Sequence, residues 1–314
     1  MATSLPSTDA STQLLDSQHL DYIHHVSFDM YGRRMATCSG DRVVKVWDLQ
    51  ADGSWQLAGD WQAHRSGVEH LGWAHPEYGT LLATAGADHD VKIWEERLEG
   101  HKKVWKALAI LSEARRIVHC CEFAPRHLGL QLATGSADGS VRIYEAFDIL
   151  NLSQWQKQGT IEEIGEPGVT CLSWCTGRFE PPTLVVGGSR ITIYRYSSSS
   201  RQWQSLTTLS SRGTVTSVAW APNVGRSFHW IAATENQSLY TYQLDRNKNL
   251  ELEASHILEE TAPMWKCQWN VTGTVLASSG DAGVVQLWKA DQKQQWKCVS
   301  QIHGDLTAGK SGIM

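Results

Sequence analysis

The chain has 314 residues and a formal net charge of −5, and 41% of its residues are hydrophobic. That length can bury a large core, and the lack of basic excess argues against nucleic acid or an anionic membrane as the main partner. No apolar run approaches the ~20 residues of a membrane span, and residues 1–20 lack the basic start and apolar segment of a secretory signal. The seven cysteines, an odd number placed mostly in apolar strand patterns, favour a reducing compartment over a disulfide framework.

Residues 1–17 are rich in Ser, Thr, Asp and Gln, and we expect a flexible leader there. Residues 23–48 then contain three short segments, HVSF, RMATCS and VVKVW, in which side chains follow a period of two. This period predicts three strands, and the Ser-Gly-Asp sequence at 39–41 predicts a tight turn between the last two. A fourth, outer strand follows from Trp55 with the sequence WQLAGDW.

This unit recurs five more times, and its third strand always closes on an aromatic residue. Successive closing residues lie 47, 50, 50, 48 and 46 positions apart, at Trp47, Trp94, Tyr144, Tyr194, Tyr242 and Trp288. The spacing is slightly longer than the ~40–45 residues of a WD-repeat blade, and the units resemble that family. We therefore predict an all-β chain with one domain over residues 18–303, a six-bladed WD-repeat β-propeller.

The first strand of each unit carries an apolar residue or cysteine two positions before an aromatic one. Residues two apart lie on one face of a strand, so these pairs are expected to pack between neighbouring blades. The pairs are Val26/Phe28, Leu71/Trp73, Cys121/Phe123, Leu172/Trp174, Val218/Trp220 and Cys267/Trp269. Most of the 15 tryptophans are interpreted as architectural for the same reason.

WD blades commonly contain a polar quartet of His, Ser or Thr, Asp and Trp. In the first blade the register assigns these positions to His19, Ser39, Asp41 and Trp47. The second blade keeps three members and has Gly86 at the Ser position, and the third keeps two without a histidine. These further assignments are His64, Asp88, Trp94, Ser136 and Asp138.

The ends of the repeat carry the main functional expectation. The first recognisable strand is the inner strand of blade one, and the last, WKCVSQI, is the outer strand of blade six, so no strand is left to fasten the ring. An unfastened ring exposes strand edges and apolar faces that invite strands from a partner. A closed ring without overlap is the alternative.

Several other patterns resemble chemical sites but lack what the chemistry needs. Residues 304–311 match a phosphate-binding loop, but only three residues follow and no helix can form, so we expect a flexible tail over 304–314. Cys171 and Cys175 have no second pair at zinc-ligand spacing, and the histidines form no catalytic triad with a carboxylate. We expect no enzyme activity, no catalytic residue, no cofactor and no metal.

Six segments go beyond the general WD pattern and closely resemble the Seh-type nucleoporin family, whose members are small propellers of the nuclear pore's Y-shaped scaffold. Blade four matches least well. The segments are HHVSFDMYGRRMATCSGD (24–41), WAHPEYG (73–79), FAPRHLGLQLATGSADGSVRIYEA (123–146), NLSQW (151–155), WAPNVGRSFH (220–229) and WNVTGTVLASSGDAG (269–283).

The resemblance implies a non-enzymatic scaffold with an open six-bladed propeller, located at the nuclear pore complex of the nuclear envelope. An α-solenoid scaffold nucleoporin would insert a seventh blade between blades six and one, alongside other Y-complex nucleoporins, in support of nucleocytoplasmic transport and mRNA export. Neither nucleic acid, membrane insertion nor a small-molecule substrate is implied. A WD-repeat adaptor of a GATOR-type nutrient-signalling complex, in the cytoplasm or at the lysosomal surface, or a COPII-like coat propeller is the alternative.

The partner blade is expected to lie against the first and last blades. Each of the candidate residues could instead be core within its own blade. The candidates are His24, Val26, Phe28, Trp265, Cys267, Trp269 and Trp288.

Overall fold

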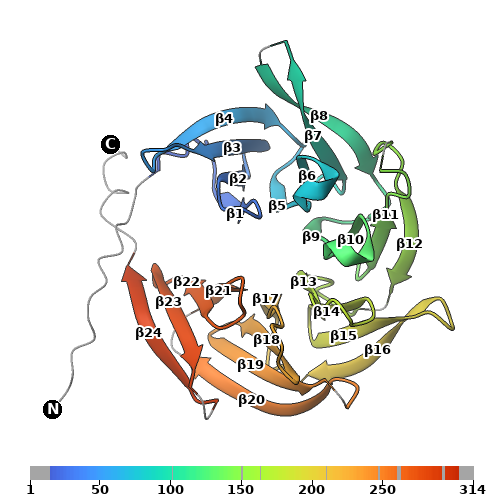
Figure 1. The fold of residues 1–314 in the computed structure, drawn as a ribbon, viewed down its shortest axis with the longest axis vertical. Helices are drawn as coiled ribbons and strands as arrows, with labels where there is room; N and C mark the ends of the chain where they lie inside the picture. The colour runs from blue at the N-terminus through green and yellow to red at the C-terminus, as the bar shows by residue number, and fades with distance from the viewer. Residues whose placement is uncertain are drawn as a thin grey trace.

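The computed structural model describes residues 15–100, 102–149, 151–162, 164–209, 211–246, 248–259, 263–291 and 294–303. Over these residues the chain is all-β, with six four-stranded antiparallel sheets, sheets one to six in chain order, arranged around a central axis (Figure 1). Two three-residue 3-10 turns, Pro76–Tyr78 and Arg126–Leu128, are its only helices in this part of the chain. The predicted six-bladed β-propeller is therefore confirmed.

Each sheet uses four consecutive strands, so the sheets are local units of the chain. Sheet one contains β1 (Ile23–Phe28), β2 (Arg34–Ser39), β3 (Val43–Leu49) and β4 (Trp55–Gln62). Sheet two contains β5 (Val68–Trp73), β6 (Leu81–Gly86), β7 (Val91–Glu99) and β8 (Lys102–Leu111). Sheet three contains β9 (Val118–Phe123), β10 (Gln131–Ser136), β11 (Val141–Glu145) and β12 (Gln156–Ile161).

The second half of the ring repeats this arrangement. Sheet four contains β13 (Cys171–Trp174), β14 (Thr183–Gly187), β15 (Ile191–Ser197) and β16 (Gln202–Leu209). Sheet five contains β17 (Val215–Trp220), β18 (Phe228–Glu235), β19 (Ser238–Asp245) and β20 (Glu251–Glu259). Sheet six contains β21 (Met264–Trp269), β22 (Leu276–Gly280), β23 (Val284–Ala290) and β24 (Trp296–His303).

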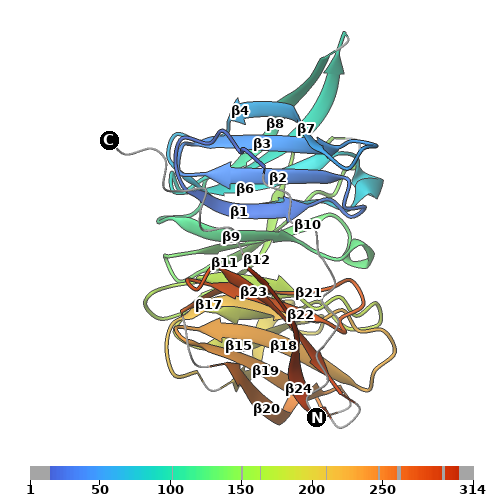
Figure 2. The same cartoon turned by 90° about the vertical axis from the view of Figure 1, so that its left-hand side faces the viewer.

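The core lies in the seams between successive sheets. Inner strands of neighbouring sheets pack side by side, in the order β1/β5, β5/β9, β9/β13, β13/β17 and β17/β21. Among the described residues no comparable seam joins β21 to β1, and in Figure 1 the ribbons of sheets six and one stand apart. The side view in Figure 2 shows the strands of sheet one crossing the disc from face to face, so the broad faces of each sheet are turned toward its neighbours.

A bulge near the start of the inner strand sets which side chain faces which neighbour. The pairing with the second strand slips between Ile23 and His25 in sheet one and between Met264 and Lys266 in sheet six. The same slip occurs in sheets two and five. After it, alternate residues face the preceding and the following sheet, as the strand period requires.

Candidate partner-binding edge

One column of inner-strand residues faces the preceding sheet. The indole Nε1 of Trp73 donates to the carbonyl of Ser27 in sheet one at 3.1 Å. The indoles of Trp174 and Trp269 likewise donate to carbonyls of sheets three and five, both at 3.1 Å. In these sheets the column is therefore covered by the preceding sheet.

In sheet one the same column is uncovered. Val26 and Phe28 are 42% and 53% exposed, whereas Leu71 and Cys121, the counterparts of Val26 in sheets two and three, are fully buried, and Phe123, a counterpart of Phe28, is 9% exposed. Burying an apolar side chain of this size contributes about 1.5–3 kcal/mol, so two such side chains left in water mark an incomplete interface.

Sheet six shows the complementary exposure on its other broad face. The third strands of sheets one to four place an apolar pair against the next sheet, and Val46, Ile93 and Ile193 of these pairs have no exposed surface. Their counterparts in β23 are Val285, which is 38% exposed, and Leu287, which is partly exposed. We define the two exposed faces, that of Val26 and Phe28 in sheet one and that of Val285 and Leu287 in sheet six, as the ring edge.

Of the residues predicted from the sequence for this edge, Val26, Phe28 and Trp265 have exposed side chains. Trp265 is 57% exposed, at the bulge position of sheet six. At the corresponding positions of sheets four and five, Thr170 and Thr216 donate to backbone carbonyls of the next sheet, at 2.6 and 2.9 Å. The bulge position of sheet six, which Trp265 occupies, therefore lies on the side where a following sheet would pack.

The other four predicted edge residues contact sheets that are already present, and their part in a partner interface stays a prediction. His24 is a bulge residue whose Nδ1–H donates to the carbonyl of Val68 in sheet two at 3.0 Å. Cys267, Trp269 and Trp288 are buried and pack against sheet five. In a strand of period two, the residues of β21 that face away from sheet five are Lys266 and Gln268, both exposed.

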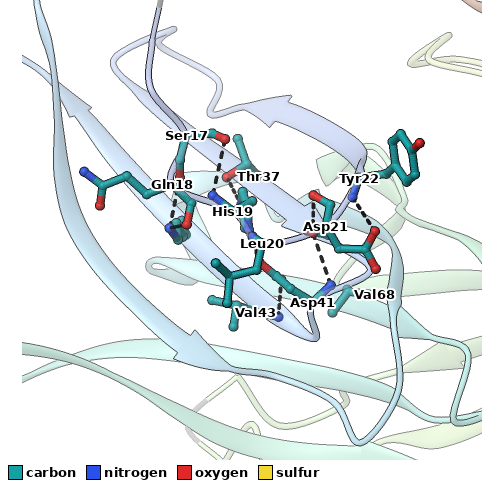
Figure 3. A network of polar contacts seen from close by, with 12 residues as sticks. Ser17, Gln18, His19, Leu20, Asp21, Tyr22, Thr37, Asp41, Val43 and Val68 are labelled. Atoms are coloured by element: carbon teal, nitrogen blue, oxygen red, sulfur yellow. Dashed lines mark hydrogen bonds and ion pairs between the residues drawn. The ribbon is translucent and has the colours of Figure 1, made fainter. Parts of the chain in front are cut away.

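The polar quartet of sheet one has a different second member from the one predicted. The imidazole of His19 contacts Asp41 through Nδ1 at 2.8 Å and Thr37 through Nε2 at 2.9 Å (Figure 3). The indole of Trp47 donates to the same Thr37 hydroxyl at 3.2 Å. This network is consistent with a neutral imidazole that donates to the carboxylate and accepts from the hydroxyl. Ser39 instead donates to the carbonyl of Asp21.

Sheet two repeats this network residue for residue. His64 contacts Asp88 at 2.7 Å and Thr84 at 2.8 Å, and the indole of Trp94 donates to Thr84 at 2.9 Å. The hydroxyl lies ten residues before the closing tryptophan, not eight. The sequence contains this signal, because both second strands carry the motif Ala-Thr at that distance.

In sheet three the two predicted quartet members bond to different groups and form no shared network. Ser136 donates to the carbonyl of Arg116, and Asp138 pairs with Arg142 at 2.7 Å. Burial raises the pKa of the Asp138 carboxyl, but the bonds from Arg142 and from the backbone N–H groups of Arg115 and Ser140 outweigh it and lower this pKa to about 2. In this blade an arginine therefore takes the place of the histidine as the side-chain partner of the aspartate.

The protonation and hydrogen bonding of these networks fit groups that hold the fold together. Burial lowers the pKa of His64, which favours its neutral form. Burial raises the pKa of Asp88, but the hydrogen bonds from the backbone N–H of Arg65 and from the imidazole of His64 outweigh it and lower this pKa, so the pair is held as a fixed hydrogen bond. No cluster of three or more His, Cys, Asp or Glu that could hold a metal occurs in the part of the chain described. The phosphate-loop match at 304–311 lies outside the described residues.

Comparison with known proteins agrees with this architecture. A family model for "WD domain, G-beta repeat" matches residues 12–48, 55–95 and 97–145, and the fold and the quartets define the class as a WD-repeat β-propeller. The chain is 40% identical to nucleoporin SEH1-A of Xenopus laevis and 40% identical to nucleoporin SEH1 of Homo sapiens, over 92% of its length and 87% of theirs. It is 42% identical to nucleoporin seh1 of Drosophila melanogaster over the same shares. The chain belongs to the Seh1 family of nucleoporins.

No helix in the described ranges is long and apolar enough to cross a membrane.

Proposed function

We propose that this protein is a non-enzymatic scaffold subunit of the nuclear pore complex at the nuclear envelope, where it associates with other nucleoporins of the Y-shaped subcomplex. Its relatives at about 40% identity carry the name nucleoporin, which supports the location and the scaffold role. In this role it supports nucleocytoplasmic transport and mRNA export by holding a partner in place.

The partner is an α-solenoid nucleoporin that inserts one β-blade at the ring edge. The observation that carries this proposal is the exposure of Val26 and Phe28: the position of Val26 is buried in all five other sheets, and that of Phe28 is buried in sheets three to six. Val285 of sheet six supports it from the opposite side of the edge, because Val285 is 38% exposed and its counterparts in all preceding sheets are buried. A single added blade covers both faces, which a partner bound elsewhere on the disc does not.

Co-expression with the α-solenoid nucleoporin of the same organism tests the proposal. We expect a stable complex that survives size-exclusion chromatography. A Phe28→Asp variant should lose the complex, because it places a charge in the seam between sheet one and the inserted blade. Phe28 is more than half exposed in the free chain, so the variant's melting temperature should stay close to that of the wild type.

Phe179→Asp is the matched control, since Phe179 is 87% exposed and lies in the loop between β13 and β14 of sheet four, away from the ring edge. Its complex should form normally. Loss of binding with both variants, or with neither, contradicts insertion at the ring edge. Recovery of only nutrient-signalling or coat subunits in purification from cells would keep the edge as a binding site and overturn the nuclear pore assignment.

A further inference from the structure

The residue that follows the bulge occupies an equivalent position in the inner strands of five sheets, one, two, three, five and six. Pairing with the second strand fixes this equivalence: His25 pairs with Cys38, His70 with Ala85, Ser217 with Thr234 and Lys266 with Ser279. Cys120 and Cys171 hold the same register in sheets three and four. All six lie around one cavity of about 930 Å³ at the mouth of the central channel: His25, His70, Cys120, Cys171, Ser217 and Lys266.

Three members of this ring, His25, His70 and Ser217, meet neutral groups of the next sheet. The imidazoles of His25 and His70 are stacked, with ring centroids 3.7 Å apart. Ser217 meets the backbone N–H and the thiol of Cys267, at 3.4 and 3.8 Å from its hydroxyl. These contacts are neutral, as expected where charge would be costly to bury.

Lys266 is the exception, because it is charged and its side of sheet six faces the ring edge. None of the ion pairs found in the described residues includes Lys266. Glu69 lines the same cavity as Lys266, and the charge of Lys266 also acts on the carboxyl of Glu122. Glu69 lies 3.9 Å from the imidazole of His24, and burial raises the pKa of Glu122 to about 8, so that carboxyl is mostly neutral at pH 7.

On the opposite side of the edge, Tyr22, Ile23, His24 and His25 of sheet one line the same cavity. The field of Lys266 reaches His25 and His70, where it adds to burial in lowering the pKa of both imidazoles. A second cation inserted here would be repelled, and a neutral residue would leave the ammonium uncompensated in a newly closed seam.

We propose that the inserted blade carries an aspartate or glutamate at the seventh position of this ring, between Lys266 and His25, where its carboxylate pairs with the Lys266 ammonium. This inference rests on the proposed function and adds the chemistry of the partner's inner strand. One acidic side chain at this height also fixes the register of the inserted strand, since a slip of one residue would turn it to the other face.

Charge reversal tests this pair in the complex with the co-expressed α-solenoid nucleoporin. Lys266→Glu should raise the dissociation constant of the complex at least about 10-fold, and Lys266→Met should raise it by less. Lys102→Glu, an exposed change in the β7–β8 hairpin, is the control and should bind as the wild type does. Replacing the partner's acidic residue with lysine should restore binding to Lys266→Glu.

The outcomes separate the two levels of the argument. Failure of the wild-type chain to bind the solenoid protein overturns the proposed function. Wild-type binding together with unchanged binding by Lys266→Glu, or a structure of the complex with a neutral residue at the seventh position, overturns the acidic pairing alone.

Discussion

Arg34 of β2 and Glu96 of β7 join sheet one to sheet two through two parallel hydrogen bonds. The terminal guanidinium nitrogens lie 2.9 and 2.7 Å from the two carboxylate oxygens of Glu96. The Nε of Arg34 also donates to Asp48 at 2.7 Å, and the guanidinium lies over the rings of Trp73 and Trp105, at 5.6 and 5.8 Å. The rim of the first seam therefore depends on a planar cation.

Arg34→Lys should lower the free energy of unfolding by about 1–3 kcal/mol. Lysine keeps the charge but has neither the two-pronged geometry nor the flat face that stacks on indole. Urea denaturation of the purified chain measures the change. Arg97→Lys is the control, because the Arg97–Glu95 pair is exposed and should contribute less than about 1 kcal/mol. Equal effects of the two variants would contradict the role assigned to Arg34.

Thr37→Val should destabilise the protein by about 1–3 kcal/mol. The change leaves the Trp47 indole without its acceptor and His19 Nε2 without its partner, and both groups are buried. Thr134→Val is the matched control, since Thr134 holds the same place in sheet three and meets only the carbonyl of Arg142 at 3.4 Å. Thermal unfolding compares the two, and a larger loss for Thr134→Val would count against the quartet in sheet one.

Asp138→Asn should cost about 2 kcal/mol at pH 7 and progressively less as the pH falls from about 4 to 2. The folded pKa of Asp138, about 2, lies below the ordinary value of 3.8. The carboxylate therefore stabilises the fold above its unfolded pKa, and this contribution disappears as the pH falls through the folded pKa. Urea unfolding at several pH values gives the difference between variant and wild type. A difference that does not shrink on acidification would exclude the ion pair as its source.

Acidification below about pH 6.5 should destabilise the ring through His25 and His70. Burial lowers the pKa of both imidazoles. The pKa of His25 is lowered further by His70 and Lys266, and that of His70 by the charge of Lys266. The unfolded chain then binds more protons than the folded one, so stability is present above the unfolded pKa and falls by up to about 1.4 kcal/mol per pH unit for each imidazole.

A double variant, His25→Gln with His70→Gln, should show a shallower loss of melting temperature between pH 7 and pH 5 than the wild type. His64 and His229 also have lowered pKa values from burial, so part of the wild-type slope should remain. Because the slope is compared and not the absolute stability, a fixed loss from the substitutions does not confuse the result. Identical slopes would show that the stacked pair does not titrate in this range.

The repeat could be predicted from the sequence because strand period, turn residues and closing aromatics all mark the same unit. The strands of all six sheets follow from patterns such as RMATCS and VVKVW in 34–47. The hydroxyl of the quartet was misplaced by two residues, since Ser39 and Thr37 share one face of β2 and both are buried. Burial alone does not separate them, whereas the hydrogen bonds do, and so does the Ala-Thr motif that recurs in sheet two.

The edge residues were harder to predict for a related reason. The prediction relied on large apolar residues. In β21, however, Cys267 and Trp269 pack against sheet five, and Lys266 faces away from it. A period of two gives two faces without saying which one has a neighbour. The contact of His24 with sheet two was also not predicted, because it depends on a bulge that no sequence pattern marks here.

Because every described sheet is built from four consecutive strands, none of them waits for a distant segment in order to form. As the polypeptide emerges from the ribosome, sheet one can close, then sheet two against it, and so on, with each nucleus stabilised by the one before. A propeller that borrows a strand from its far end must leave a blade unfinished until synthesis is over. Here the sheets can form one after another along the chain, and each step closes only the short loops between consecutive strands.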